Sequence, residues 1–124
     1  MQSIRWGWIL LGGFFAELAI IIIVLPLSWL AGQESLLYTA PAASFAAAFV
    51  FGAWVSRKAS RHRVVHGLLV GVVATLIYVG ISFGQPEPVA YLIAHALKVL
   101  GGAMGGYVSS RRTADNDRQQ VANR

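Results

Sequence analysis

Residues 6–30 read WGWILLGGFFAELAIIIIVLPLSWL, an apolar run in which Glu17 is the only charged residue. At about 1.5 Å per residue, a helix of this length reaches roughly 37 Å, enough to cross a hydrocarbon core of about 30 Å with some tilt. We therefore expect a membrane-spanning helix with Glu17 near the middle of the bilayer. The run is much longer than the apolar core of a secretory signal peptide, about 7–15 residues, and no A-x-A-like cleavage site follows it, so we expect it to be retained.

The composition of the whole chain is typical of a membrane protein. Of its 124 residues, 56% are hydrophobic and only 12% are charged, whereas a soluble domain usually has about 25% charged residues. The chain has no cysteine, which excludes disulfides, thiolate metal sites and a cysteine nucleophile. We find no phosphate-binding loop, no H-E-x-x-H or paired-carboxylate motif, and no serine–histidine arrangement with an acid partner. We therefore expect no enzyme activity, no cofactor and no metal.

Four apolar segments divide the chain, and we expect each of them to form a transmembrane helix. Their expected ranges are 6–30, 36–55, 64–83 and 89–108. Short polar turns at 31–35 and 84–88 join the first pair and the second pair. The helices form one domain, residues 1–110, and the polar residues 111–124 have no apolar face, so we expect a disordered tail. The predicted fold class is all-α, a four-transmembrane-helix bundle.

The charges of the loops predict the orientation of the bundle. Basic residues gather near the N-terminus, between the second and third segments, and in the tail. The charged residues of the opposite turns are only Glu34 and Glu87. The positive-inside rule therefore predicts a multi-pass protein of the inner (plasma) membrane with both termini in the cytoplasm. The residues that we assign to this orientation, and to contact with anionic lipid headgroups, are Arg57, Lys58, Arg61, Arg63, Arg111 and Arg112. This bias accounts for the net charge of +5 without a nucleic-acid partner.

Glu17, His95 and Lys98 are the ionisable side chains that we expect within the membrane, and His66 lies at its cytoplasmic edge. Counted from the helix ends, Glu17 and Lys98 lie at similar depths, about 15–17 Å from the surfaces. A lone charge at that depth costs roughly 2.5–3.5 kcal/mol or more, so we expect the two opposite charges to face one another. His95 lies one turn before Lys98 on the same helical face, and Thr75 and Tyr78 are further candidates to line the same cavity.

This polar group supports two interpretations. In the first, Glu17, Lys98 and His95 form a proton or ion relay, or a polar substrate site, in a small transporter or ion-conducting unit. In the second, the pair only fixes the register of the helices, or Glu17 is uncharged, and the protein is a non-catalytic accessory subunit that acts through helix contacts. Transport is the function that we predict, with the accessory subunit as the alternative.

Small residues recur at four-residue spacing in every segment, and such faces let helix backbones approach closely within a membrane. The packing positions that we predict are Gly13, Gly52, Gly67, Gly71, Gly101, Gly102, Gly105 and Gly106. The glycines of the fourth segment cover two adjacent faces, more than one neighbouring helix needs. A homodimer, or a contact with another membrane protein, is therefore a second interpretation of that segment.

The two halves of the chain also match one another. An offset of 58 residues places Leu10, Leu11 and Gly13 on residues of the same type in the third segment. The match is consistent with two parallel helical-hairpin repeats, and equally with chance agreement between apolar sequences.

Residues 11–17, LGGFFAE, resemble the first helix of the small multidrug resistance transporters, which are four-helix chains of similar length. In that family a membrane-embedded glutamate exchanges protons for cationic drugs within a dimer, so the resemblance implies that role for Glu17. The rest of the chain departs from the pattern, because residues 18–21 lack the usual small polar residues, and the basic loop 57–63 and Lys98 are foreign to it. The overall layout also resembles small uncharacterised four-helix membrane proteins of bacteria, which implies a fold and no activity.

Overall fold

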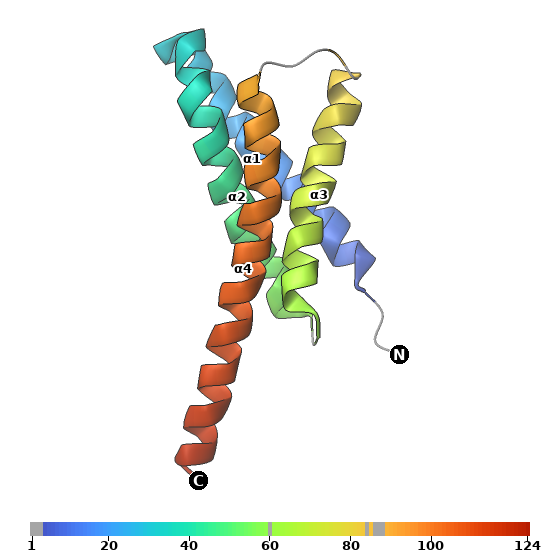
Figure 1. The fold of residues 1–124 in the computed structure, drawn as a ribbon, viewed down its shortest axis with the longest axis vertical. Coiled ribbons are helices and arrows are strands. Elements are labelled where there is room, and N and C mark those ends of the chain that lie inside the picture. Colours follow the sequence, from blue (N-terminus) through green and yellow to red (C-terminus); the bar gives the residue numbers. More distant parts are fainter. Residues whose placement is uncertain (1–3, 60, 84, 86–88) are drawn as a thin grey trace.

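A computed structural model describes residues 4–59, 61–83, 85 and 89–124. Its long helices are α1 (Trp6–Ala31), α2 (Leu36–Lys58), α3 (Arg63–Ser82) and α4 (Val89–Ala122), and a short 3-10 turn, η1 (Gln33–Ser35), precedes α2 (Figure 1). All four helices are long and apolar enough to span a membrane. The all-α four-helix fold class is thereby confirmed, and it indicates a multi-pass membrane protein. The expected turn at 84–88 lies, except for Gln85, outside the described residues.

Exposed aromatic side chains lie near both ends of the helices. Trp6, at the start of α1, is 54% exposed, while Trp29 and Tyr38, at the opposite end of the bundle, are 82% and 80% exposed. Tryptophan and tyrosine favour the two membrane–water interfaces, where a flat apolar ring and a polar group are both accommodated. Their positions therefore agree with a bundle that crosses a bilayer.

The helices pack so that α2 and α3 lie between α1 and α4. α4 packs along α2 and α3, α1 packs on the same two helices, and α2 and α3 also contact one another. Within the described residues, α1 and α4 do not approach one another closely along their backbones. A twofold relation between two hairpins would make the α1–α4 contact equivalent to the α2–α3 contact. The packing departs from that relation, and the sequence duplication stays a prediction.

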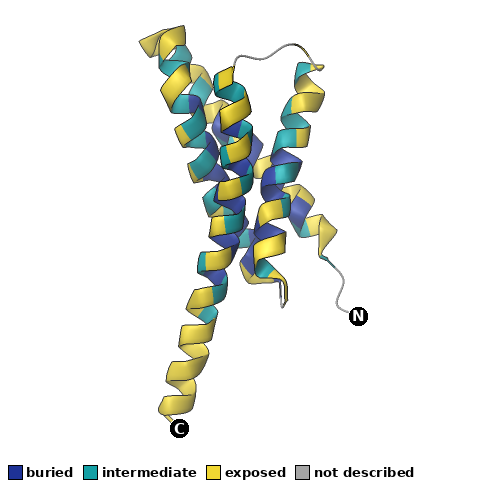
Figure 2. Cartoon of the chain, viewed as in Figure 1, coloured by how far each residue is buried: buried dark blue, intermediate teal, exposed yellow. Residues whose placement is uncertain are grey.

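The apolar core lies toward the end of the bundle that carries Arg5, Arg57, Arg61 and Arg63, which we call the arginine end. The core residues are Ile9, Ala16, Val55, Val70, Val73 and Ala74, and most of them are fully buried. Figure 2 shows the buried residues where the four helices meet. Small and β-branched side chains predominate here, which lets the helices lie close together.

Glycines make this close approach possible. Gly102 of α4 lies between two glycines, since a Cβ built on Gly52 of α2 would be 2.8 Å from its Cα, and a Cβ on Gly67 of α3 would meet its carbonyl oxygen. The other predicted packing glycines also meet neighbouring helices: Gly13 faces Val73, Gly71 faces Lys98, Gly101 and Gly105 face Phe45 and Phe49, and Gly106 faces Arg63. Both glycine faces of α4 are therefore covered within the chain, by α2 and by α3. This finding removes the reason for expecting a homodimer contact there.

The fourth helix is longer than the sequence predicted. α4 continues to Ala122, so the expectation of a helix ending at 108 and of a disordered tail at 111–124 is corrected. The tail has no apolar face, but it also has no glycine or proline before Ala122, and a helix that is already formed adds residues at little cost. Arg63 contacts the C-terminal part of α4. Its Nη1 donates to the carbonyl of Ser109 at 3.2 Å and to the hydroxyl of Thr113.

Candidate functional site

A buried ion pair joins α1 to α4. The Nζ of Lys98 donates a hydrogen bond to Oε2 of Glu17 at 2.8 Å, and each residue is only 2% exposed. The two opposite charges that the sequence places at one depth therefore face one another, as predicted. Because the backbones of α1 and α4 stay apart, the two side chains themselves span the distance between the helices.

Glycines at two helix crossings set the position of the pair. A Cβ on Gly71 of α3 would lie 2.7 Å from the carbonyl carbon of Lys98, so α3 and α4 can meet here only without that side chain. A Cβ on Gly13 of α1 would lie 2.7 Å from Cβ of Val73. α3 thus holds both partner helices at close range, and Lys98 reaches past it to the carboxylate on α1.

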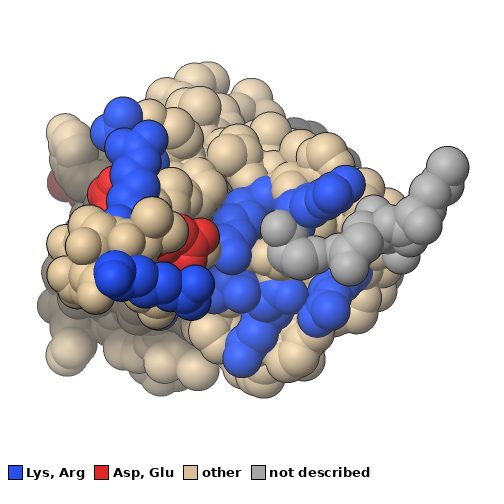
Figure 3. Space-filling model, turned by 90° about the horizontal axis from the view of Figure 1, so that it is seen from below, with Lys and Arg blue, Asp and Glu red and all other residues tan. Residues whose placement is uncertain are grey.

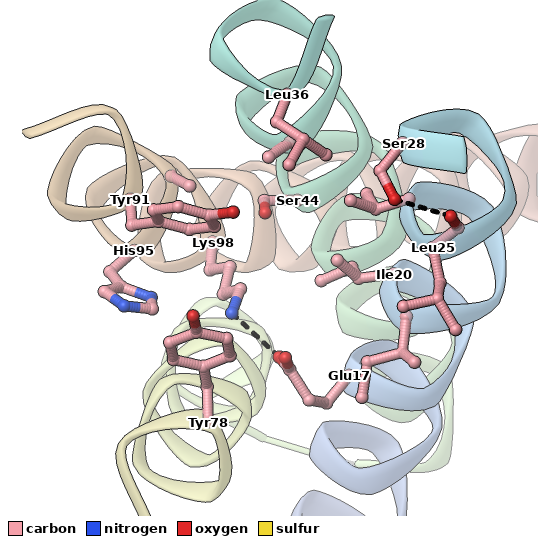
Figure 4. A pocket seen from close by; sticks show the side chains of 14 residues that line it. Glu17, Ile20, Leu25, Ser28, Leu36, Ser44, Tyr78, Tyr91, His95 and Lys98 are labelled. Atoms are coloured by element: carbon pink, nitrogen blue, oxygen red, sulfur yellow. Dashed lines mark hydrogen bonds and ion pairs between the residues drawn. The ribbon is translucent and has the colours of Figure 1, made fainter. Parts of the chain in front are cut away.

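A cavity of about 170 Å³ borders the ion pair on the side away from the arginine end. It extends along α1 from Glu17 to Ser28 and along α4 from Lys98 back to Tyr91. Figure 4 shows Tyr78, Tyr91, His95 and Lys98 on one side and Glu17, Ile20, Leu25 and Ser28 on the other. The remaining lining residues are Ile21, Val24, Leu36, Ala40, Ser44 and Ala94. The cavity therefore combines apolar walls with a polar group at its deep end.

One aromatic ring lies beside the ammonium group of Lys98, and two further rings pack against that ring. The Nζ of Lys98 lies 5.0 Å from the centroid of the Tyr78 ring, a distance at which the ring face attracts a cation. Tyr78 stacks on Tyr91 with centroids 6.1 Å apart, and it lies 5.0 Å from the ring of His95. The ammonium of Lys98 consequently has two partners, a carboxylate and an aromatic ring.

The structure brings together most of the residues that the sequence singled out for this site. His95 and Tyr78 line the cavity with Glu17 and Lys98. Thr75 is not among the lining residues, because its hydroxyl donates to the carbonyl of Gly71 at 3.0 Å within its own helix, a common arrangement for threonine in membrane helices.

Sequence analysis missed three polar residues of the cavity, Ser28, Ser44 and Tyr91. Tyr91 lies seven residues before Lys98, which is about two helical turns and therefore the same face, so the spacing would have identified it. Ser44 appeared in the sequence only as one of the small residues of the second segment. Its 1% exposure depends on the packing of α2 against the other helices, which the sequence does not give.

Basic side chains gather at the arginine end, as Figure 3 shows from below. Arg57, Lys58, Arg61, Arg111 and Arg112 are exposed there. Arg63 differs, because its Nε donates to the carbonyl of Ala59 at 3.2 Å and its Nη1 contacts α4. Its guanidinium is thus engaged within the protein, where we had expected contact with lipid headgroups.

Comparison with known proteins assigns the chain to no family. No family model, no curated protein and no solved structure matches the chain. The resemblance of residues 11–17 to the small multidrug resistance transporters has no support beyond those residues. No group of histidine, aspartate and glutamate residues in the described part of the chain could hold a metal ion.

Proposed function

We infer that the protein is a small membrane transporter or ion-conducting unit in which Glu17 and Lys98 handle the transported charge. The observation that carries this proposal is the position of the ion pair at the deep end of a cavity. Burying two charges is costly, and an apolar pair of similar volume often stabilises a protein as well or better. A pair that serves only stability gains nothing from a neighbouring cavity, whereas a pair that exchanges partners needs one.

The packing on the two sides of the pair supports the same proposal. On the far side the cavity leads away from Glu17 toward Ser28 and Leu36, which are partly exposed. On the arginine side, Val55 and Val70 are fully buried and close against Gly12 of α1. A path that is hollow on one side of a charged site and closed on the other is what a transporter presents when its site faces one side of the membrane.

Proton flux into liposomes tests the proposal. With the unaltered chain in the bilayer, an imposed pH gradient should decay faster than in empty liposomes, as followed with a trapped pH-sensitive dye. Glu17→Gln, which keeps the shape of the side chain and removes its charge, should return the decay to the empty-liposome rate. The matched control is Glu34→Gln, because Glu34 lies in η1 outside the cavity and is exposed. Equal rates for the unaltered chain and Glu17→Gln would contradict the proposal.

The accessory-subunit alternative rests on a different observation. The last turns of α4 are exposed and project beyond the other helices (Figures 1 and 2), which leaves a polar helix available to a partner. If flux is absent and a second protein co-purifies only while residues 111–122 are present, this alternative replaces transport.

We also propose that the arginine end faces the cytoplasm of a cell bounded by the inner (plasma) membrane. The positive-inside rule and the position of the basic side chains at one end support this orientation. Because the chain has no cysteine, single cysteines report the two sides directly. An impermeant maleimide added to intact cells should label Ser35→Cys and leave Ser110→Cys unlabelled; the opposite pattern would reverse the orientation.

A further inference from the structure

We propose that the cavity binds a small monovalent anion at Lys98, and that one proton enters with it and neutralises Glu17. The inference rests on the transport function proposed above and adds the class of solute. It follows from the unequal surroundings of the two charges, from the charge balance of the site and from the size of the cavity.

Lys98 and Glu17 differ in their interaction partners. Lys98 is held both by Oε2 of Glu17 at 2.8 Å and by the Tyr78 ring at 5.0 Å. If the contact between the charges opens, the ammonium keeps its ring partner. Glu17 is then a carboxylate that is 2% exposed and without its cation, and a buried charge without a partner is costly. Opening the pair therefore leaves Lys98 beside an aromatic ring and leaves the negative charge of Glu17 uncompensated.

The exchange balances in charge and in hydrogen bonds. In the closed state Glu17 carries one negative and Lys98 one positive charge. A proton that binds Oε2 ends the hydrogen bond from Nζ, and an oxygen of the entering anion accepts that N–H instead. The site is neutral before and after the step. A cation, in contrast, would require Lys98 to lose a proton and with it the attraction of the Tyr78 ring.

The cavity has room for a small solute. Its volume of about 170 Å³ is many times the roughly 10–15 Å³ that a single buried water molecule needs, so an anion of a few heavy atoms fits. The hydroxyls of Ser44, Tyr78 and Tyr91 and the ring of His95 supply polar groups in the walls. A divalent anion would leave one negative charge uncompensated beside Lys98, which is costly at a buried site.

The titratable groups that share the cavity with Glu17 come from two helices. α3 contributes Tyr78, and α4 contributes Tyr91, His95 and Lys98. The lining residues from α2 carry no titratable group, and α1 adds none besides Glu17. Among the described residues that line the cavity, Glu17 is the only carboxylate, and replacing it separates proton binding from anion binding.

Nitrate is a suitable probe, because it is small, monovalent and carries no proton of its own near neutral pH. Sodium nitrate is added to the purified full chain in weakly buffered detergent near pH 7, and a pH-sensitive dye reports proton uptake. Sodium gluconate at the same ionic strength, whose anion is much bulkier than nitrate, is the control. We expect about one proton taken up per nitrate bound, and none with gluconate.

Three variants make the test specific. Glu17→Gln should still bind nitrate, measured by calorimetry, without proton uptake. Lys98→Met should lose both. Ala94→Leu should also lose both, because Ala94 is buried in the cavity wall and a larger side chain fills the space while the ion pair stays intact. If Lys98→Met does not fold, Ala94→Leu still tests whether nitrate binding and proton uptake both need the cavity.

The outcomes separate this inference from the proposed function. Nitrate binding without proton uptake in the unaltered chain overturns the inference, as does proton release on adding tetramethylammonium gluconate. If Glu17-dependent proton flux occurs in liposomes while nitrate has no effect, the transport function stands and the anion is wrong. If the unaltered chain shows neither flux nor nitrate-linked uptake, both proposals fail.

Discussion

The two halves of this bundle, on either side of the Glu17–Lys98 pair, are built from different residues for different tasks. Toward the arginine end, glycines and valines such as Gly67, Gly102 and Val70 bring the helix backbones into close contact. Toward the other end, larger polar rings border a cavity of about 170 Å³. Close packing in the half toward the arginine end, the dense half, fixes the positions of the helices. The Glu17–Lys98 pair can therefore be held beside the cavity of the other half, the hollow half.

The largest effect is expected at the boundary between the halves. Lys98→Met leaves the buried Glu17 without its cation, and breaking a buried pair in this way costs roughly 3–5 kcal/mol. The matched control is Lys58→Met, because Lys58 is exposed. Thermal unfolding in mild detergent measures both. If the double variant Glu17→Gln/Lys98→Met is more stable than the single lysine variant, the two charges are coupled; simple additivity would mean that they are not.

The dense half should not accept even one methyl group at its centre. Gly102→Ala places a Cβ against the carbonyl of Gly67, and such overpacking costs about 1–3 kcal/mol. Gly80→Ala is the control, since a Cβ there meets nothing within 4 Å. Thermal melting of the two variants gives the difference, and equal melting temperatures would show that the inner packing is looser than described.

Arg63 should matter to the extension of α4 and little to the rest of the bundle. Arg63→Met removes hydrogen bonds to Ser109 and Thr113, each contributing about 1 kcal/mol. Amide hydrogen exchange in residues 111–122 should then rise about thirtyfold, since every 1.4 kcal/mol or so corresponds to a factor of ten. Arg61→Met is the control, because Arg61 is exposed. Unchanged amide exchange in Arg63→Met would mean that the C-terminal part of α4 is stable without this residue.

The smallest effect on stability is expected in the hollow half. Ala94→Leu adds three carbon atoms, but it adds them at a wall with open space beside it. We expect a change in stability within about 1 kcal/mol, together with loss of proton flux. A loss of stability as large as that of Gly102→Ala would remove the contrast between the halves.

The sequence predicts the apolar spans well, because hydrophobicity along a single helix is a local property. It also predicts the Glu17–Lys98 contact, since two opposite charges at one depth in so small a bundle have few other partners. It does not predict which helices are neighbours. The glycines of α4 therefore suggested a second chain, whereas α2 and α3 cover them.

Other errors have the same origin in contacts between distant residues. The extension of α4 is contacted by Arg63, which follows the loop between α2 and α3. Ser44 enters the cavity wall only through the packing of α2. Thr75 is a different case, because its hydroxyl donates to Gly71 within its own helix. Residues of these types gain their roles from their three-dimensional neighbours, which sequence spacing alone does not supply.

The length of α4 gives the site a mechanical connection to the arginine end. Lys98 and Ala122 belong to one continuous helix, and about 24 residues of helix separate them by roughly 36 Å. If the helix moves as a stiff rod that pivots at Lys98, a tilt of about 5° displaces its far end by about 3 Å. α4 would then act as a lever that reports the occupancy of the cavity on the opposite side of the membrane. Spin labels at Ser35→Cys and Ala122→Cys would measure this displacement, and distances unchanged by nitrate would exclude it.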